Sequence, residues 1–80
     1  MNSMIQCRLR ELMAEKSRRD GRRVTYVDIV RGTGVAASTL VRLANDKAAR
    51  VDLSVISRLC SFFGCQPGDL FVLVPESSPG

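Results

Sequence analysis

The chain has 80 residues, of which 45% are hydrophobic and 25% are charged, and its formal net charge is +4. This composition is typical of a globular protein, and a chain of this length forms one domain with a modest core. Apolar runs such as residues 70–74 are far shorter than the ~20 residues that cross a bilayer, and the start lacks the features of a signal peptide, so we expect a cytoplasmic protein without a membrane partner.

Basic residues are concentrated in the first part of the chain. Residues 1–50 contain 11 of the 12 Lys and Arg residues and 5 of the 8 acidic residues, for a net charge of +6, whereas residues 51–80 carry −2. This asymmetry is expected of a surface that binds a polyanion, although a solvated surface with no partner has the same composition. Charge alone therefore leaves both interpretations open.

The three cysteines do not follow the spacing of a disulfide framework or a metal site. Cys7, Cys60 and Cys65 are odd in number, and the chain has no His and no C-x-x-C pair. We predict reduced thiols that act as small apolar residues, no metal and no cofactor.

The first predicted helix covers about residues 7–16. Four apolar residues at helical spacing would form its buried stripe: Ile5, Leu9, Leu12 and Met13. Residues 17–24 read SRRDGRRV and are predicted to be a loop, because Asp20-Gly21 is a turn sequence. The four arginines of this loop have two interpretations, a solvated segment or an arm that contacts phosphates.

Local signals predict a second helix over about residues 26–31. Thr25 is a good N-cap residue, and Asp28 stands three residues later, as in a capping box. Val24 and Ile29 occupy the two positions of a hydrophobic staple. The sequence Gly-Thr-Gly that follows is expected to end the helix.

A third helix is predicted from residue 36 or 37 to about residue 44. Its core face would hold Val35, Leu40 and Leu43, and the opposite face Ala37, Ser38, Val41 and Arg42. Asn45-Asp46 is expected to end the helix, because Asn tolerates the left-handed conformation found there.

Two more helices and a terminal strand complete the predicted elements. A fourth helix should run from an Asp52 cap to residue 63, with Gly64 after it. Its buried stripe would contain Leu53, Ile56, Leu59, Cys60 and Phe63, and Val51 with Ile56 would form a second staple. Pro67 suits the first turn of a short helix at 67–71, and residues 72–74 are β-prone.

Two short helices joined by a Gly-containing turn, the second with a small polar outer face, form a helix-turn-helix pattern. Residues 25–47, TYVDIVRGTGVAASTLVRLANDK, resemble the Cro/C1-type (XRE-like) helix-turn-helix family. CRLRELM at 7–13 looks like the first helix of this family, and FGCQPGDL at 63–70 looks like the end of its small single-domain branch. The resemblance covers nearly the whole chain.

The resemblance implies an all-α fold, a five-helix lambda-repressor-like DNA-binding domain over residues 5–75, with residues 72–74 as a candidate C-terminal β-strand and 76–80 as a flexible tail. It also implies a sequence-specific transcriptional regulator, expected to be a repressor, that inserts its third helix into the major groove of double-stranded DNA. Members often bind as dimers, so a homodimer is expected here.

The resemblance places base-reading side chains on the outer face of the third helix, at Ala37, Ser38, Val41 and Arg42. Arg42 is the strongest candidate, because Arg donates to guanine O6 and N7 together. Ala37 and Val41 either pack on a thymine methyl or simply fill an exposed face. Candidate phosphate contacts are Arg22, Arg23, Thr25, Tyr26, Thr39, Asn45 and Lys47, with Arg50 as a weaker one.

Several residues depart from the family pattern. Tyr26 stands where Gln is common, Ala36 where a Ser or Thr N-cap is common, and Asp46 where Gly is frequent. The missing N-cap hydroxyl at position 36 lowers the stability of the helix by ~1 kcal/mol. Gly32 weakens the end of the second helix, and the loop before that helix is longer than usual. These departures bear on the target sequence and the affinity more than on the fold.

The alternatives to DNA binding are a protein-interaction module and an enzyme. A protein-interaction module, such as an antitoxin or an accessory subunit, would use Phe62, Phe71 and residues 72–74 as its surface, unless these merely close a small core. Residues 72–74 would then pair with their own copy or with residues 4–6. An enzyme is not expected, since the chain has no His, no Gly-rich phosphate loop and no nucleophile–base pair.

Overall fold

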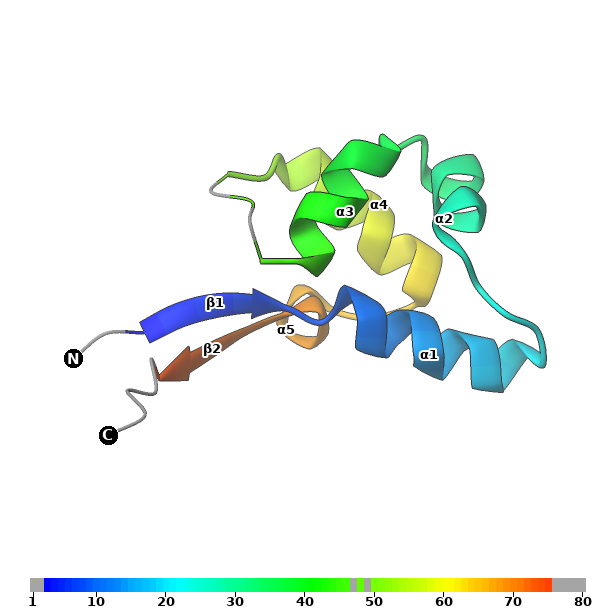
Figure 1. Ribbon diagram of the computed structural model, residues 1–80, viewed down its shortest axis with the longest axis horizontal. Helices are drawn as coiled ribbons and strands as arrows, with labels where there is room; N and C mark the ends of the chain where they lie inside the picture. Colours follow the sequence, from blue (N-terminus) through cyan, green and yellow to red (C-terminus); the bar gives the residue numbers. More distant parts are fainter. Residues whose placement is uncertain (1–2, 47, 49, 76–80) are drawn as a thin grey trace.

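A computed structural model describes residues 3–46, 48 and 50–75. These residues form five helices and a two-stranded sheet (Figure 1). In chain order the elements are β1 (Ser3–Cys7), α1 (Leu9–Asp20), α2 (Tyr26–Thr33), α3 (Ala37–Ala44), α4 (Leu53–Phe63), α5 (Pro67–Leu70) and β2 (Phe71–Pro75). The predicted five-helix fold with a C-terminal strand is confirmed, and the proposed tail at 76–80 lies outside the described residues. None of the helices described has the length and hydropathy needed to cross a bilayer.

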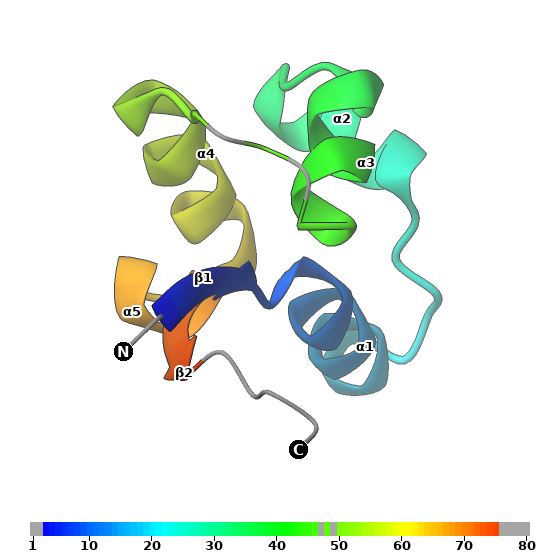
Figure 2. The same ribbon diagram turned by 60° about the vertical axis from the view of Figure 1, so that its left-hand side comes forward.

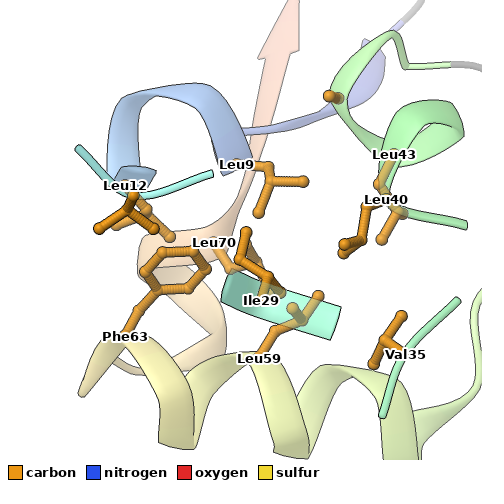
Figure 3. Packing of buried hydrophobic residues seen from close by; sticks show 11 residues of the cluster. Leu9, Leu12, Ile29, Val35, Leu40, Leu43, Leu59, Phe63 and Leu70 are labelled. Atoms are coloured by element: carbon orange, nitrogen blue, oxygen red, sulfur yellow. The ribbon is translucent and has the colours of Figure 1, made fainter. Parts of the chain in front are cut away.

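The core draws one fully buried side chain from each helix. Leu9, Ile29, Leu40, Leu59 and Leu70 come from α1 to α5 in that order, and each has 0% of its surface exposed. Burying one such side chain contributes roughly 1.5–3 kcal/mol. Figure 3 shows these side chains converging between the helices. The core residues predicted for the third helix are therefore confirmed, and so are Leu9, Leu12, Leu59 and Phe63; the staple residues Val24 and Ile29 are buried as well.

The first element described is a strand, and the first helix starts two residues later than predicted. β1 pairs antiparallel with β2, with Ile5 opposite Leu73 and Cys7 opposite Phe71. The expectation that Ile5 belongs to the buried stripe of the first helix is wrong, because Ile5 lies in β1 and is 62% exposed. Pairing with β2 gives residues 3–7 backbone hydrogen bonds along one edge of the strand, and α1 starts only at Leu9. Of the two pairings considered for residues 72–74, the one with residues 4–6 is found.

The first helix extends further than predicted, to Asp20. Lys16 and Asp20 form an ion pair at 3.0 Å, one helical turn apart, and Gly21 ends the helix with a left-handed φ of 70°. The predicted loop therefore begins at residue 21, and its first two arginines, Arg18 and Arg19, belong to the last turn of α1. Cations there interact favourably with the helix dipole.

The fourth helix agrees with its prediction except at its start. Leu59 and Phe63 are buried and Ile56 and Cys60 are half-buried, but Leu53, expected in the stripe, is 80% exposed. At 100° per residue, Leu53 lies about 100° from the centre of the Leu59 and Phe63 face, so its side chain points past the edge of the core. Gly64 ends the helix in the left-handed conformation, as predicted.

Candidate DNA-binding surface

The start of α2 is fixed by the predicted capping box. The Thr25 Oγ1 accepts a hydrogen bond from the Asp28 backbone N–H at 3.3 Å, and Asp28 Oδ2 accepts one from the Thr25 N–H at 2.9 Å. The bond from the Thr25 backbone, helped by the nearby Arg22, lowers the pKa of the Asp28 carboxyl. Two of the free N–H groups at this helix end are thus satisfied within the protein.

A tight turn joins α2 to α3. Gly34 has φ 77° and donates its N–H to the Val30 carbonyl at 2.8 Å. The Thr33 hydroxyl donates to the Ile29 carbonyl at 2.6 Å and accepts from the Val35 N–H at 3.1 Å. A left-handed φ is available to glycine without strain, so Gly34 sets the direction in which α3 leaves the turn. Buried Val35 then anchors the entry into α3.

The two faces of α3 differ as predicted. Leu40, Leu43 and Ala44 are buried against the rest of the protein. The four residues predicted to read bases, Ala37, Ser38, Val41 and Arg42, are all exposed on the opposite face. Ala36 occupies the N-cap position and forms no side-chain cap bond, as expected from its missing hydroxyl. Within the described part of the chain, Arg42 takes part in no ion pair.

Two side-chain hydrogen bonds hold the end of α3. Asp46 has a positive φ of 57°, so this residue and not Asn45 adopts the left-handed conformation that we expected of Asn. Asp46 Oδ1 accepts from the Cys7 N–H at 2.9 Å, and Asn45 Oδ1 accepts from the Arg10 guanidinium. The carboxylate at position 46, a departure from the family pattern, thus connects α3 to the junction of β1 and α1.

The candidate phosphate residues form two groups. Arg22, Arg23 and Thr25 are exposed around the start of α2, and Tyr26 there is half-buried against the core. The second group lies on α3: Thr39, which is half-buried, and Asn45 at its end. Lys47 lies outside the described residues.

The weaker candidate, Arg50, belongs to neither group. It is exposed and lines a groove on the side of the hairpin, together with Ile5 and Val51.

The arginines between α1 and α2 have different surroundings. Arg22 is 70% exposed and pairs with Asp28 at 3.6 Å, whereas Arg19 donates to the Phe63 carbonyl at 3.4 Å. The segment predicted as one arginine-rich arm is therefore divided, and only Arg22 and Arg23 adjoin α2.

Sequence reasoning missed Arg10 as a residue of this region. Its hydrogen bond to Asn45 joins residues 35 positions apart, which no local pattern reveals.

The three cysteine thiols are partly buried, and burial changes the pKa of two of them. Cys7, Cys60 and Cys65 are free and half-buried, as predicted for small apolar residues. Burial raises the pKa of the Cys7 thiol, and burial together with the neighbouring Cys60 raises that of Cys65 to about 11. Both thiols are therefore protonated at neutral pH. Among the residues described, no group of three His, Cys, Asp or Glu side chains is arranged to hold a metal ion.

In a comparison with known protein families, residues 8–76 match the model described as the Cro/C1-type HTH DNA-binding domain. Searches of curated proteins and of solved structures gave no match. The matched range contains both helices of the helix-turn-helix, the turn and the capped start of α2. The chain therefore belongs to the family of Cro/C1-type helix-turn-helix DNA-binding domains.

Proposed function

We propose that this DNA-binding regulator is a sequence-specific repressor, which binds as a homodimer and inserts α3 into the major groove. The exposed outer face of α3 carries the proposal. Ala37, Ser38 and Val41 are small enough to let the helix approach the base edges, and Arg42 is the one long donor among them. The major groove admits one α-helix, and the turn at Gly34 together with the tied end at Asp46 orients α3 relative to the domain.

Each residue of this face has a proposed role. Arg42 donates to O6 and N7 of one guanine, which supplies most of the sequence discrimination. Ala37 and Val41 pack against thymine methyl groups, and Ser38 donates to a base or to a phosphate. The proposal is supported by the exposure of all four side chains and by the buried position of the opposite face of α3.

Arg22 and Arg23 are proposed to contact phosphates next to α2. The Arg22 ion pair with Asp28 is long, at 3.6 Å, and the Arg22 side chain is 70% exposed, so the pair is weak and a phosphate can compete for the guanidinium. Thr25 uses its hydroxyl in the capping box and supports this contact by orienting the helix end. Tyr26, Thr39, Asn45 and Lys47 are proposed as additional backbone contacts.

Repression follows from occupancy of the groove, because a bound domain excludes other proteins from the same DNA. The proposed function requires no catalytic step and no cofactor, and it is carried out in the cytoplasm.

Two substitutions of one residue test the base-reading role. Arg42→Ala removes both charge and donors, whereas Arg42→Lys keeps the charge but cannot form the two parallel bonds of the guanidinium. Affinity would be measured by fluorescence anisotropy for a duplex selected by the wild-type protein and for a random duplex. We expect both variants to lose ~1–3 kcal/mol on the selected duplex, and Arg42→Lys to bind random DNA as the wild type does. Equal losses on both duplexes would assign Arg42 to a phosphate instead.

A further inference from the structure

Two cysteines flank the turn that ends α4. The Cys60 carbonyl accepts hydrogen bonds from the N–H of Gly64, which has a φ of 66°, and from the N–H of Cys65 at 3.0 Å. The bond across five positions is typical of the Schellman motif, in which the side chains of these two positions frequently make an apolar contact. Here both positions hold thiols, and we call Cys60 and Cys65 the thiol pair.

The fold holds the thiol pair together at the edge of the core. Both cysteines are free and half-buried, and both pack against the buried cluster. Burial raises the pKa of Cys65 to about 11, and the neighbouring Cys60 adds to this through its charge and a side-chain hydrogen bond. Cys65 is therefore a neutral thiol at pH 7, within hydrogen-bonding reach of a second sulfur.

A hollow in the surface leads to Cys65. It has a volume of about 260 Å³, and Leu12 of α1 and Phe63 of α4 line it together with Cys65. This is several times the ~30 Å³ that a water molecule occupies in the liquid, so a small molecule can reach the sulfur. None of the described residues that line the hollow belongs to α2 or α3. In Figure 2, α5 lies below α4, whereas α2 and α3 lie in the upper right of the view.

We propose that the thiol pair binds trivalent arsenicals, with one arsenic atom bridging the sulfurs of Cys60 and Cys65. An organic arsenical with two hydroxyl groups on arsenic condenses with two thiols. At each sulfur an arsenic–oxygen bond breaks and an arsenic–sulfur bond forms, and the thiol proton leaves with the hydroxide as water. Arsenic remains trivalent throughout, so no oxidant or reductant is consumed. The bridged product is uncharged, which suits a half-buried position.

The state of the thiol pair favours this ligand over a metal cation or a disulfide. A metal ion binds deprotonated thiols and completes its coordination with further ligands. Among the residues described, however, no group of three His, Cys, Asp or Glu side chains is arranged for one. A disulfide requires attack by a thiolate and an approach of the sulfurs to about 2.03–2.05 Å, whereas Cys65 is neutral. An arsenical with two exchangeable groups needs two neutral thiols only.

Phenylarsine oxide, which hydrates to such a dihydroxy compound, tests the proposal on the full chain. With a reductant that contains no thiol, native mass spectrometry should show one phenylarsenic group per chain, removed by 2,3-dimercaptopropanol. Cys60→Ser and Cys65→Ser should each lower the affinity by roughly a hundredfold or more, because a single arsenic–sulfur bond loses the benefit of the second thiol nearby. Cys7→Ser is the matched control, since Cys7 is also half-buried but lies in β1, and it should bind as the wild type does.

Urea denaturation tests whether the fold prepares the site. Because the native chain holds the two thiols together, it should bind the arsenical more tightly than the unfolded chain does, and the urea midpoint should rise when phenylarsine oxide is added. Wild-type affinity in either single variant, loss of binding in Cys7→Ser, or a midpoint that stays unchanged or falls would each overturn the proposal. If a serine variant does not fold by circular dichroism, the alanine variant at the same position replaces it with the same expectation.

Discussion

The contact between α2 and α4 depends on the absence of a side chain at Gly32. A Cβ atom added there would lie 2.7 Å from both Cδ1 and Cε1 of the Phe62 ring, far inside van der Waals contact. The ring packs edge-on against Phe63 with centroids 5.1 Å apart, and the Lys16 ammonium lies 5.1 Å from its centroid, so a shift of the ring to relieve the overlap would disturb both contacts. Gly32 therefore allows α2 to pack closely against α4, although glycine has a low helix propensity and weakens α2.

The expected effect of Gly32→Ala follows from two opposing contributions. Replacing glycine by alanine in a helix raises the free energy of unfolding by roughly 0.5–1 kcal/mol. Forcing an extra carbon into a packed contact typically lowers it by about 1–3 kcal/mol. We expect net destabilisation of about 1 kcal/mol, which lowers the Tm by roughly 4–8 °C in a domain of this size. Urea denaturation at a fixed protein concentration measures the free energy directly.

A double-mutant cycle separates the two contributions. In a Phe62→Ala background the clash disappears, so Gly32→Ala should become stabilising by about 0.5–1 kcal/mol. Gly68→Ala in α5 is the matched control, because a Cβ there meets nothing within 4 Å. Destabilisation of the same size in both backgrounds, or none in the wild type, would refute the argument from the Phe62 contact.

Three further predictions concern the start of α2. Thr25→Ala should cost ~1 kcal/mol in urea denaturation, since it removes the cap, and an unchanged midpoint would show that the bond contributes nothing. The pKa of the Asp28 carboxyl in the folded protein lies below its ordinary value of 3.8. The carboxylate therefore contributes to stability above pH 3.8, and this contribution is lost as the pH falls through the folded-state pKa. Asp28→Asn should remove this part of the dependence of Tm on acid pH, and identical Tm profiles for the variant and the wild type would contradict the prediction. Arg22→Ala with Arg23→Ala should lower the slope of log affinity against log salt by up to about 1.8 with the preferred site unchanged, and an unaltered slope would mean that these arginines contact no phosphate.

The parts of the fold that local chemistry specifies could be predicted from the sequence. The capping box at Thr25 and Asp28 and the left-handed glycine that follows Phe63 depend on residues within a few positions of one another. The exposed face of α3, with Arg42, follows from helical spacing once Leu40 is placed in the core. These features define the helix-turn-helix and the candidate base-reading residues.

The remaining features depend on contacts between distant residues. β1 forms only because residues 71–75 return to pair with it, and the Arg8 N–H donates to the Leu70 carbonyl at 2.7 Å where the two ends meet. Asp46 is held by a bond to Cys7, 39 positions away. No periodicity within a window of ten residues contains this information, so the sequence left two pairings open for residues 72–74 and did not predict the tied end of α3.

Selection of bound sequences from a random duplex library, at about physiological salt, tests directly whether α3 reads base sequence. We expect a sharp consensus with two-fold symmetry, half-sites about one helical turn apart, and a guanine in each half-site whose enrichment disappears in Arg42→Ala. Weak, salt-sensitive binding without sequence enrichment would contradict this expectation, and would show that α3 does not read base sequence.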